Sequence, residues 1–251
     1  MKFKNKTFLI TGAKQGMGYE IAKKLHSQGA KLILNDKESD QKFDAVCKEF
    51  NAKKFVCDLS QIQNIKQELT KILDNNVQLD GLVAQHAYMN MRKFAEHEES
   101  DWWKIIETNL MGTFVLIREC VPHLIKTKGK IVITSSYWGL TGWPEASAYA
   151  SSKAGLISLV KSLGRELAPL GINVNAIAPG VINTPQLEVD AKNLNLSLEK
   201  ILEMYAQNIP LGRVGRSEEI ASVVSFLLDP DQNALVGQVI NANGGEVRAR
   251  A

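Results

Sequence analysis

The sequence predicts one α/β domain built on a doubly wound parallel sheet with helices on both faces. The chain has 251 residues, a length that suits a single domain of this class. Short apolar runs alternate along it with longer amphipathic stretches, and the runs are continuously apolar, as in strands buried on both faces. No linker, repeat or low-complexity tract divides the chain, so we expect a single domain over residues 1–251.

Seven short apolar runs are the predicted strands. In chain order they are Thr7–Thr11, Lys31–Asn35, Lys54–Cys57, Gly81–Gln85, Lys130–Thr134, Asn173–Ala176 and Gln238–Asn241. Helical periodicity marks four of the intervening stretches, Met17–Leu25, Ile105–Cys120, Ala146–Leu167 and Ser217–Leu228. Residues 184–216 break this rhythm. We expect them to form a substrate-loop insertion, which is either a lid or binding loop or a mobile surface loop.

Composition excludes several classes of function. The apolar fraction of 45% and the charged fraction of 23% are ordinary for a folded domain. A net charge of +3 is too small and too dispersed to predict a nucleic-acid or membrane partner, and no run is long enough to span a membrane. Three cysteines without a CxxC pattern favour a reducing compartment, and the four histidines lack metal-ligand spacing. We therefore expect a cytoplasmic protein without a metal.

A glycine-rich turn follows the first predicted strand and opens the first predicted helix. Its glycines permit a tight turn and close backbone approach, while the N–H groups at the helix start can bind a pyrophosphate. Strand, turn and helix in this order are what a Rossmann-type dinucleotide site requires. The cofactor-binding residues predicted here are Gly12, Lys14, Gln15, Gly16, Met17 and Gly18.

Asp36, just after the second predicted strand, is the candidate ribose ligand. It follows the glycine turn by the roughly 20 residues typical of such sites. A carboxylate there can accept hydrogen bonds from the ribose hydroxyls of NAD and would repel the additional phosphate of NADP. Lys14 and Lys37 argue in the other direction, since either could compensate that phosphate. We expect NAD, with NADP as the alternative.

Tyr149 and Lys153 lie four residues apart near the start of a predicted helix, so they share one helix face. A free tyrosine has a pKa of about 10, and lowering it to neutrality requires about 4 kcal/mol. One positive charge at about 4 Å supplies on the order of 4 kcal/mol at an effective dielectric near 20. Lys153 alone is therefore expected to come close to this shift, and an oxidised nicotinamide ring would add to it.

Ser136 follows the apolar run Lys130–Thr134, at the carboxyl end of a predicted parallel strand. This edge of the sheet is where substrates bind in such folds. A hydroxyl here can donate to a carbonyl or accept from an alcohol beside the phenol of Tyr149.

Taken together, these motifs resemble those of the short-chain dehydrogenases/reductases over nearly the whole chain. Further motifs that carry the resemblance are Asp58, Thr108-Asn109-Leu110-Met111-Gly112, Pro179-Gly180-Val181-Ile182-Asn183-Thr184 and Asn243-Gly244-Gly245. The resemblance implies that Tyr149 is the general acid/base, Ser136 orients the substrate oxygen, and Lys153 also holds the nicotinamide ribose. It implies that Asn109 holds a water in a proton relay.

The same resemblance implies further cofactor contacts. Asp58 and Leu59 would flank the adenine, and Ile182 and Thr184 would fix the carboxamide after the Pro179-Gly180 turn. One motif departs from the family pattern. Where the family usually has Asn-Asn-Ala-Gly, this chain has Ala84-Gln85-His86-Ala87. Gln85 could keep the polar cofactor contact, Ala87 adds a methyl group near the cofactor, and His86 either reaches the cofactor or packs beneath it.

Aromatic residues cluster near the expected substrate site. Tyr88, Trp138 and Trp143, with Tyr205 as a further candidate, would form an apolar wall around a ring or short acyl chain, or else pack the loop or a subunit contact. The resemblance also implies a homotetramer, with the apolar helices at Ile105–Cys120 and Leu156–Leu167 as contact surfaces.

The favoured function is NAD-dependent interconversion of a secondary alcohol and a ketone, with hydride transfer and proton transfer by Tyr149. One alternative is an NADPH-dependent 3-oxoacyl-thioester reductase, for which Asp36 is the discriminating residue. The other is a dinucleotide-sensing module without catalysis, against which Asn109, Ser136, Tyr149 and Lys153 argue.

Overall fold

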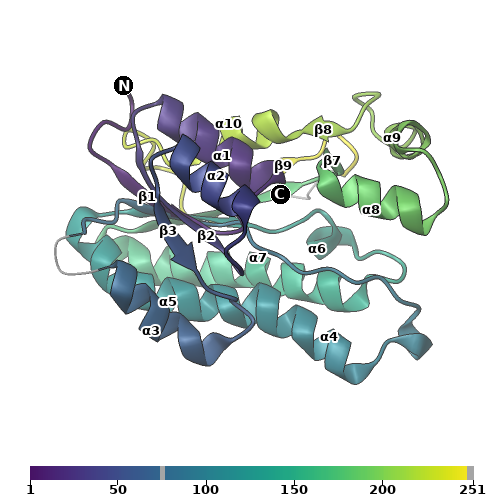
Figure 1. The fold of residues 1–251 in the computed structure, drawn as a ribbon, viewed down its shortest axis with the longest axis horizontal. Coiled ribbons are helices and arrows are strands. Elements are labelled where there is room, and N and C mark those ends of the chain that lie inside the picture. The colour runs from purple at the N-terminus through teal and green to yellow at the C-terminus, as the bar shows by residue number, and fades with distance from the viewer. Residues whose placement is uncertain (74–76, 248–251) are drawn as a thin grey trace.

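The computed structural model describes residues 1–73 and 77–247, and its centre is a seven-stranded parallel sheet (Figure 1). The strand order is β3-β2-β1-β4-β5-β6-β9. These strands are β1 (Thr7–Ile10), β2 (Lys31–Asp36), β3 (Lys53–Val56), β4 (Gly81–Ala84), β5 (Lys130–Thr134), β6 (Asn173–Pro179) and β9 (Val239–Ala242). All seven predicted strands are confirmed, with ends that differ by at most three residues.

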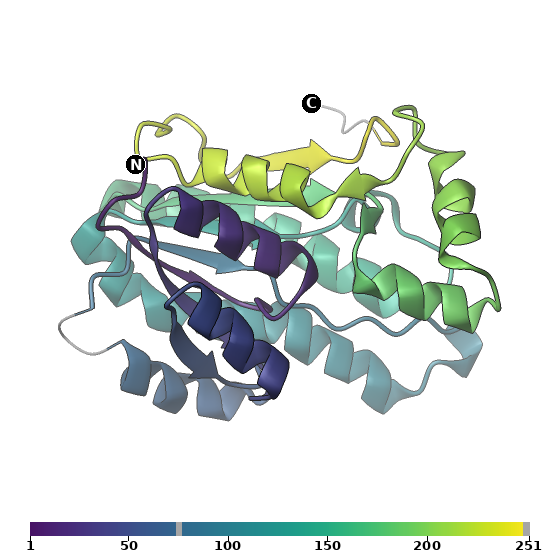
Figure 2. The ribbon, with the colours of Figure 1, turned by 45° about the horizontal axis from the view of Figure 1, so that its top comes forward.

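Helices cover both faces of the sheet, as predicted. They are α1 (Gly16–Ser27), α2 (Gln41–Glu49), α3 (Ile62–Ile72), α4 (Glu99–Ile106), α5 (Gly112–Thr127), α6 (Trp138–Thr141), α7 (Ser147–Leu167), α8 (Pro185–Asn193), α9 (Leu198–Ala206) and α10 (Ser217–Leu227). Short turns are η1 (Phe94–Glu96), η2 (Glu107–Met111) and η3 (Ala168–Leu170). Apolar side chains of α1, α2 and α10 pack on one face, and those of α3, α5 and α7 on the other (Figure 2).

Alternation along each strand explains why the apolar runs are continuous. In β1, Leu9 belongs to the core beneath α3, α5 and α7, while Phe8 and Ile10 belong to the core beneath α1, α2 and α10. In β5, Ile131 belongs to the core beneath α3, α5 and α7, and Val132 belongs to the core beneath α1, α2 and α10. Because successive side chains point to opposite faces, a strand between two helical layers is apolar at every position.

The stretch 105–120 differs from the single periodic helix expected from its sequence. The structure divides it into the end of α4, the π-helical turn η2 and the start of α5. The wider turn adds a residue to the helical repeat and places Asn109 in the interior, where it is fully buried. Apolar periodicity does not reveal such a turn, because the apolar residues on either side stay in phase with their own helices.

The insertion at residues 184–216 contains two helices, α8 and α9, and is not an open loop. Figure 1 shows both helices in green at one end of the molecule, on the side opposite the N-terminus. Leu187, Ala191 and Ile201 form a small apolar cluster that holds the two helices together. The flanking strands β7 (Ile182–Asn183) and β8 (Gly215–Arg216) pair with each other and anchor both ends of the insertion.

The described residues contain no helix long and apolar enough to cross a membrane. In the same part of the chain, no three His, Cys, Asp or Glu side chains are grouped so that they could hold a metal ion. Cys47, Cys57 and Cys120 are buried free thiols.

Candidate active site

The larger of two adjoining pockets, about 750 Å3, opens where β1, β2 and β4 end. The predicted cofactor residues that line it are Gly12, Lys14, Gln15, Gly16, Met17, Gly18, Asp36, Asp58, Leu59, Gln85 and Thr184. Residues far apart in sequence thus meet at the carboxyl edge of the parallel sheet, the position at which such folds bind dinucleotides.

The glycine turn has the geometry that a diphosphate requires. Gly12 has a φ of +61°, and a Cβ atom at Gly18 would come within 2.1 Å of the Gly12 carbonyl oxygen, so side chains are excluded at both positions. Helix α1 then begins at Gly16, without an acidic residue in its first turn and without a side-chain cap from Gln15. Its first N–H groups therefore remain available for an anion, and the residues fit a dinucleotide.

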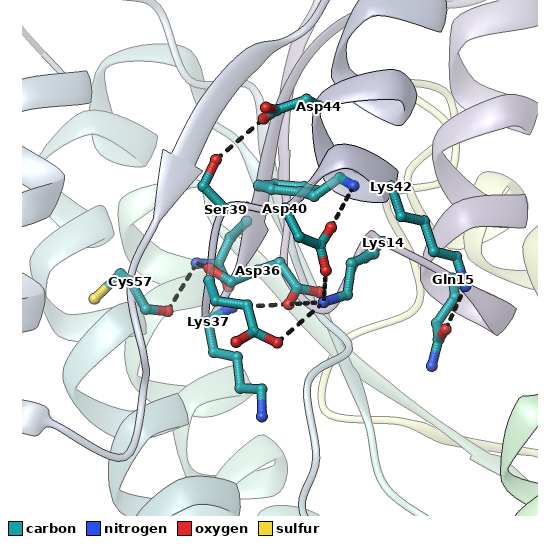
Figure 3. A network of polar contacts seen from close by, with 12 residues as sticks. Lys14, Gln15, Asp36, Lys37, Ser39, Asp40, Lys42, Asp44 and Cys57 are labelled. Carbon is teal, nitrogen blue, oxygen red and sulfur yellow. Dashed lines mark hydrogen bonds and ion pairs between the residues drawn. The ribbon is translucent and has the colours of Figure 1, made fainter.

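Lys14 is surrounded by carboxylates at the ribose end of this pocket (Figure 3). Its ammonium lies 3.5 Å from Asp36, 3.4 Å from Glu38 and 3.0 Å from Asp40. Burial disfavours the charged form, but these carboxylates outweigh it and raise the pKa of Lys14. Within this group one cation faces three anions, while Lys37 and Lys42 also line the pocket.

The smaller pocket, about 240 Å3, adjoins the larger one along Met17, Ala87, Thr184 and Gln186, which line both. Its wall is mainly apolar and aromatic. The predicted residues that line it are Ser136, Trp138, Tyr149, Gly180, Ile182 and Tyr205.

Tyr149 and Ser136 stand together in the smaller pocket. Helix α7 carries Tyr149, whereas Ser136 lies just beyond the end of β5. Burial raises the pKa of the Tyr149 phenol to about 12, although its interaction with the Ser136 hydroxyl acts to lower it. The phenol is therefore protonated at neutral pH.

Lys153 lies near Tyr149 on α7. Its ammonium is buried, donates to the carbonyl oxygen of Thr134 at 2.9 Å and lies 5.4 Å from the centre of the Tyr149 ring. Burial lowers the pKa of Lys153 to about 7. Burial thus disfavours the charged form of both Tyr149 and Lys153, and the lowering of the Tyr149 pKa by Lys153 stays a prediction.

Asn109 is held in place by the π-helical turn and the loop after β4. Its side-chain oxygen accepts from the N–H of Tyr88 at 2.7 Å, while its amide group donates to the Tyr88 carbonyl at 2.9 Å and to the Ser152 hydroxyl at 3.0 Å. Ser152 precedes Lys153 on α7. The side chain is thus fixed beside α7 by contacts that the sequence motif alone does not reveal.

The departure at residues 84–87 leaves the larger pocket intact. Gln85 lines it and accepts from the Thr134 hydroxyl at 2.5 Å, and the methyl group of Ala87 lies on the boundary between the pockets. His86 also lines the larger pocket, and its ring is hydrogen-bonded to Thr11 and Thr108.

Asn109 and Lys153 line neither pocket, and three further expected residues lie outside the pocket predicted for them. Trp143 is 41% exposed and stacks on Trp138, outside the smaller pocket. Tyr88 lines the larger pocket, where its hydroxyl donates to Asp101, so it is not part of the substrate wall. Pro179 ends β6, and its carbonyl accepts from the N–H of Tyr137 without lining either pocket.

Sequence reasoning missed five residues of the smaller pocket, Met89, Tyr137, Gln186, Leu187 and Asp190, and named Val181 only as part of a motif. Leu187 and Asp190 are three residues apart and share one face of α8. That spacing was visible in the sequence, but the insertion was expected to be a loop.

The sheet and its paired pockets define an α/β dinucleotide-binding protein, and comparisons with known proteins narrow this class. A family model described as "Enoyl-(Acyl carrier protein) reductase" matches residues 12–246. A solved structure described as a "short chain dehydrogenase/reductase family protein" superimposes with a TM-score of 0.86, covering 98% of each chain at 24% identity, which supports the fold.

Curated relatives are similar over almost the full length. The 3-oxoacyl-acyl-carrier-protein reductase FabG of Thermotoga maritima is 35% identical, covering 98% of this chain and all of its own. Proteins with the same name from Aquifex aeolicus and Rickettsia prowazekii are 36% and 35% identical, covering 98% and 96% of both chains. The chain belongs to the short-chain dehydrogenase/reductase family. It is an oxidoreductase that acts on a carbonyl or hydroxyl group with a nicotinamide dinucleotide.

Proposed function

We propose that the chain reduces the ketone of a short 3-oxoacyl thioester with NADH. The observation that carries this proposal is the position of Tyr149 and Ser136 in a small apolar pocket that adjoins the dinucleotide pocket. This replaces oxidation of an unspecified secondary alcohol as the main hypothesis. Lys153, near the Tyr149 ring, and Asn109, held by Ser152 of the same helix, complete the proposed catalytic set and argue against a module that only senses the dinucleotide.

The charge of the smaller pocket favours a neutral acyl group. None of the described residues that line it is a lysine or arginine, and one of them, Asp190, carries a carboxyl group. A free 3-oxo acid would bring its carboxylate towards Asp190 without a cation to pair with, whereas a thioester is uncharged at that position. The name shared by the curated relatives supports the same substrate class.

The phenol of Tyr149 is suited to donate a proton. Reduction of a ketone creates an alkoxide, which takes its proton from a neighbouring acid. With a pKa of about 12, Tyr149 carries that proton at neutral pH. The Ser136 hydroxyl, next to the phenol, is placed to donate to the substrate oxygen and so to stabilise the negative charge that develops there.

A nicotinamide dinucleotide supplies the hydride, and this chain's residues fit it in the larger pocket. The glycine turn would hold its diphosphate, Asp36 its adenosine ribose, and Asp58 and Leu59 its adenine. Gln85, Ile182, Thr184 and the Pro179-Gly180 turn are the remaining proposed cofactor contacts. Asp36, Glu38 and Asp40 support NADH over NADPH, because they already surround Lys14 and repel an additional phosphate.

A panel of substrates and cofactors tests this proposal. Purified protein is given acetoacetyl-thioester, free acetoacetate or an uncharged cyclic ketone, each with NADH or NADPH, and oxidation of the cofactor is followed by absorbance. We expect the highest kcat/KM for the thioester with NADH. Equal or faster turnover of free acetoacetate would contradict the substrate assignment, and faster turnover with NADPH would contradict the cofactor assignment alone.

We also propose that copies of the chain associate into a homotetramer. Phe114 and Ile125 on α5 and Trp103 on α4 are exposed apolar residues on adjacent helices, with exposed fractions of 38%, 41% and 51%. Such side chains often mark subunit contacts. The mass in solution, measured by light scattering during gel filtration, tests this assignment, and the variant Phe114→Glu should shift it towards smaller species.

A further inference from the structure

His86 lies where the glycine turn, the end of β4 and the π-helical turn η2 meet. Its ring Nδ1 is 2.8 Å from the Thr11 hydroxyl, and its ring Nε2 is 3.1 Å from the Thr108 carbonyl oxygen and 3.4 Å from the Thr113 hydroxyl. Thr11 is the last residue before Gly12, and Thr108 immediately precedes Asn109. One imidazole therefore joins the cofactor turn to the turn that carries a proposed catalytic residue.

The neighbouring groups determine which ring nitrogen carries the proton. The Thr11 hydroxyl oxygen accepts from the backbone N–H groups of Gln85 at 2.9 Å and His86 at 3.1 Å, and its own hydrogen can reach either His86 Nδ1 at 2.8 Å or the Val83 carbonyl oxygen at 3.4 Å, of which Nδ1 is the nearer acceptor. Thr108 offers only a carbonyl acceptor, which requires a hydrogen on Nε2. His86 is therefore the neutral Nε2–H tautomer, with both nitrogens hydrogen-bonded.

The electrostatic surroundings keep the ring neutral. Burial, and then the charge of Lys153, lower the pKa of His86 to about 4. A second ring proton would also have to face the hydroxyl hydrogen of Thr11. An imidazole that stays neutral and fully hydrogen-bonded is not suited to carry protons, but it is suited to hold two segments at a fixed separation.

Because Thr108 and Asn109 are consecutive residues of η2, the contact between His86 and Thr108 also restrains the position of Asn109. Thr113, the other neighbour of Nε2, donates its hydroxyl hydrogen to the Asn109 carbonyl oxygen at 2.7 Å. Thr108 in η2 and Thr113 in the first turn of α5 thus contact the same ring. On the opposite side, Asn109 is held by Ser152 of α7, at 3.0 Å.

We propose that His86 is a positioning residue that couples the dinucleotide turn at Thr11 to the Asn109 turn. This inference rests on the proposed function in one respect, the assignment of Asn109 to the catalytic set. Simple packing beneath the cofactor does not account for the geometry, because an apolar side chain of similar size would remove the contacts at both ring nitrogens, with the Thr11 hydroxyl on one side and with Thr108 and Thr113 on the other.

His86→Ala, measured in the full chain, tests the coupling. We expect a loss of kcat of about 10- to 100-fold, the size expected when a catalytic group moves by about 1 Å. The Kd of NADH, from fluorescence titration, should rise about threefold to tenfold. Hydrogen exchange of the segment 107–113 should become at least tenfold faster, while exchange in α10 stays unchanged.

His86→Gln serves as the conservative variant, because glutamine has an acceptor and a donor that can contact Thr11 and Thr108. It should recover most of the kcat and the exchange protection, and it keeps the test informative if the alanine variant does not fold. A double-mutant cycle with Ser152→Ala tests the connection through Asn109. The two changes should be strongly non-additive in kcat, because each releases the same side chain.

Unchanged exchange in segment 107–113 in the alanine variant would overturn the coupling, as would fully additive effects in the cycle. The exchange and NADH-binding measurements need no ketone substrate. Failure of the proposed function, seen as no turnover of thioesters by the unmodified chain, is therefore distinguishable from failure of this inference.

Discussion

The two pockets that meet at Met17 and Ala87 are built in different ways. The dinucleotide pocket is formed largely at strand ends and by the backbone of one glycine turn, in segments that the sheet itself places side by side. The substrate pocket depends on side chains from α8 and α9 and from the loops after β4 and β5, and these elements meet only in the tertiary structure. Backbone geometry defines the first pocket, and side-chain identity defines the second.

This difference implies that the two pockets respond differently to substitution. A change in the glycine turn alters a conformation that few residues can adopt, so it affects dinucleotide binding whatever the substrate. A change in the aromatic wall or in α8 alters size and charge while the backbone stays in place, so it shifts preference among substrates. Variants of residues that line only one of the pockets should therefore separate binding of the dinucleotide from chemistry on the ketone.

Tyr149→Phe is expected to have the largest effect. It removes the proton donor without changing the ring, and general acid/base groups contribute about 10²- to 10⁴-fold. We expect kcat to fall by about 10³-fold while the Kd of NADH changes less than twofold. Steady-state kinetics and fluorescence titration check this, with Tyr137→Phe, the neighbouring phenol, as the matched control. Retained turnover would remove Tyr149 from the catalytic set.

The pH dependence should differ between the two reaction directions. A phenol with a pKa of about 12 is protonated throughout the neutral range, so proton donation by Tyr149 does not limit reduction there. Oxidation needs the phenolate, whose fraction rises about tenfold per pH unit below the pKa. We therefore expect the oxidation rate to rise steadily from pH 7 to pH 10. An oxidation rate that levels off near pH 8 would show that the working pKa is much lower.

These two experiments concern the residues that sequence reasoning found most readily. The glycine turn, Asp36, Ser136 and Tyr149 were predictable because their chemistry requires particular residue types at strand ends or on one helix face. The seven strands were predictable because burial on both faces leaves a continuous apolar run. The sequence therefore predicted the frame of the site and several of the side chains that line its pockets.

Other features depended on contacts between distant segments. Lys153 was expected to lower the pKa of Tyr149, but the cost of burial depends on the surrounding protein and is not visible in a spacing of four residues. Leu187 and Asp190 were missed as residues of the smaller pocket because the insertion interrupts the regular alternation of strands and helices, so its helices were not predicted. The contacts of His86 required knowledge that Thr11 and Thr108 lie beside each other.

Removal of two carboxylates near Lys14 is expected to have the next largest effect, which is on cofactor preference. In the double variant Asp36→Asn/Asp40→Asn, Lys14 loses two anionic partners, and asparagine at position 40 can still cap α2 through the Phe43 N–H. We expect the ratio of NADPH to NADH affinity to rise about tenfold, a change of about 1.4 kcal/mol in relative binding. Competitive titration of the two cofactors measures this ratio.

Asp44→Asn is the control for this comparison. Asp44 lies on the same helix but pairs with Lys54 at 2.7 Å and not with Lys14. Its replacement should leave the cofactor ratio unchanged. If both variants shift the ratio equally, the general charge of this surface, and not the group around Lys14, controls cofactor preference.

Asp190→Asn tests the charge of the substrate pocket. Asparagine keeps the acceptor that Gln186 contacts at 3.0 Å but removes the negative charge. KM for free acetoacetate should fall about threefold to tenfold, corresponding to roughly 1 kcal/mol of relieved repulsion at the dielectric of a protein surface, whereas KM for the thioester should change little. Glu188→Gln on the same helix is the control, because Glu188 is exposed and lines neither pocket. Equal changes for both substrates would mean that Asp190 does not select by charge.

Trp143→Ala is expected to have the smallest effect on function, and it marks where the substrate pocket ends. Trp143 stacks on Trp138 at 5.2 Å with nearly parallel rings, so its loss should lower the free energy of unfolding by about 1 kcal/mol. KM for the thioester should change less than twofold, since only Trp138 of the stacked pair lines the pocket. Urea denaturation and steady-state kinetics separate the two effects. A tenfold rise in KM without loss of stability would instead place Trp143 in contact with the substrate and extend the aromatic wall to the outer ring.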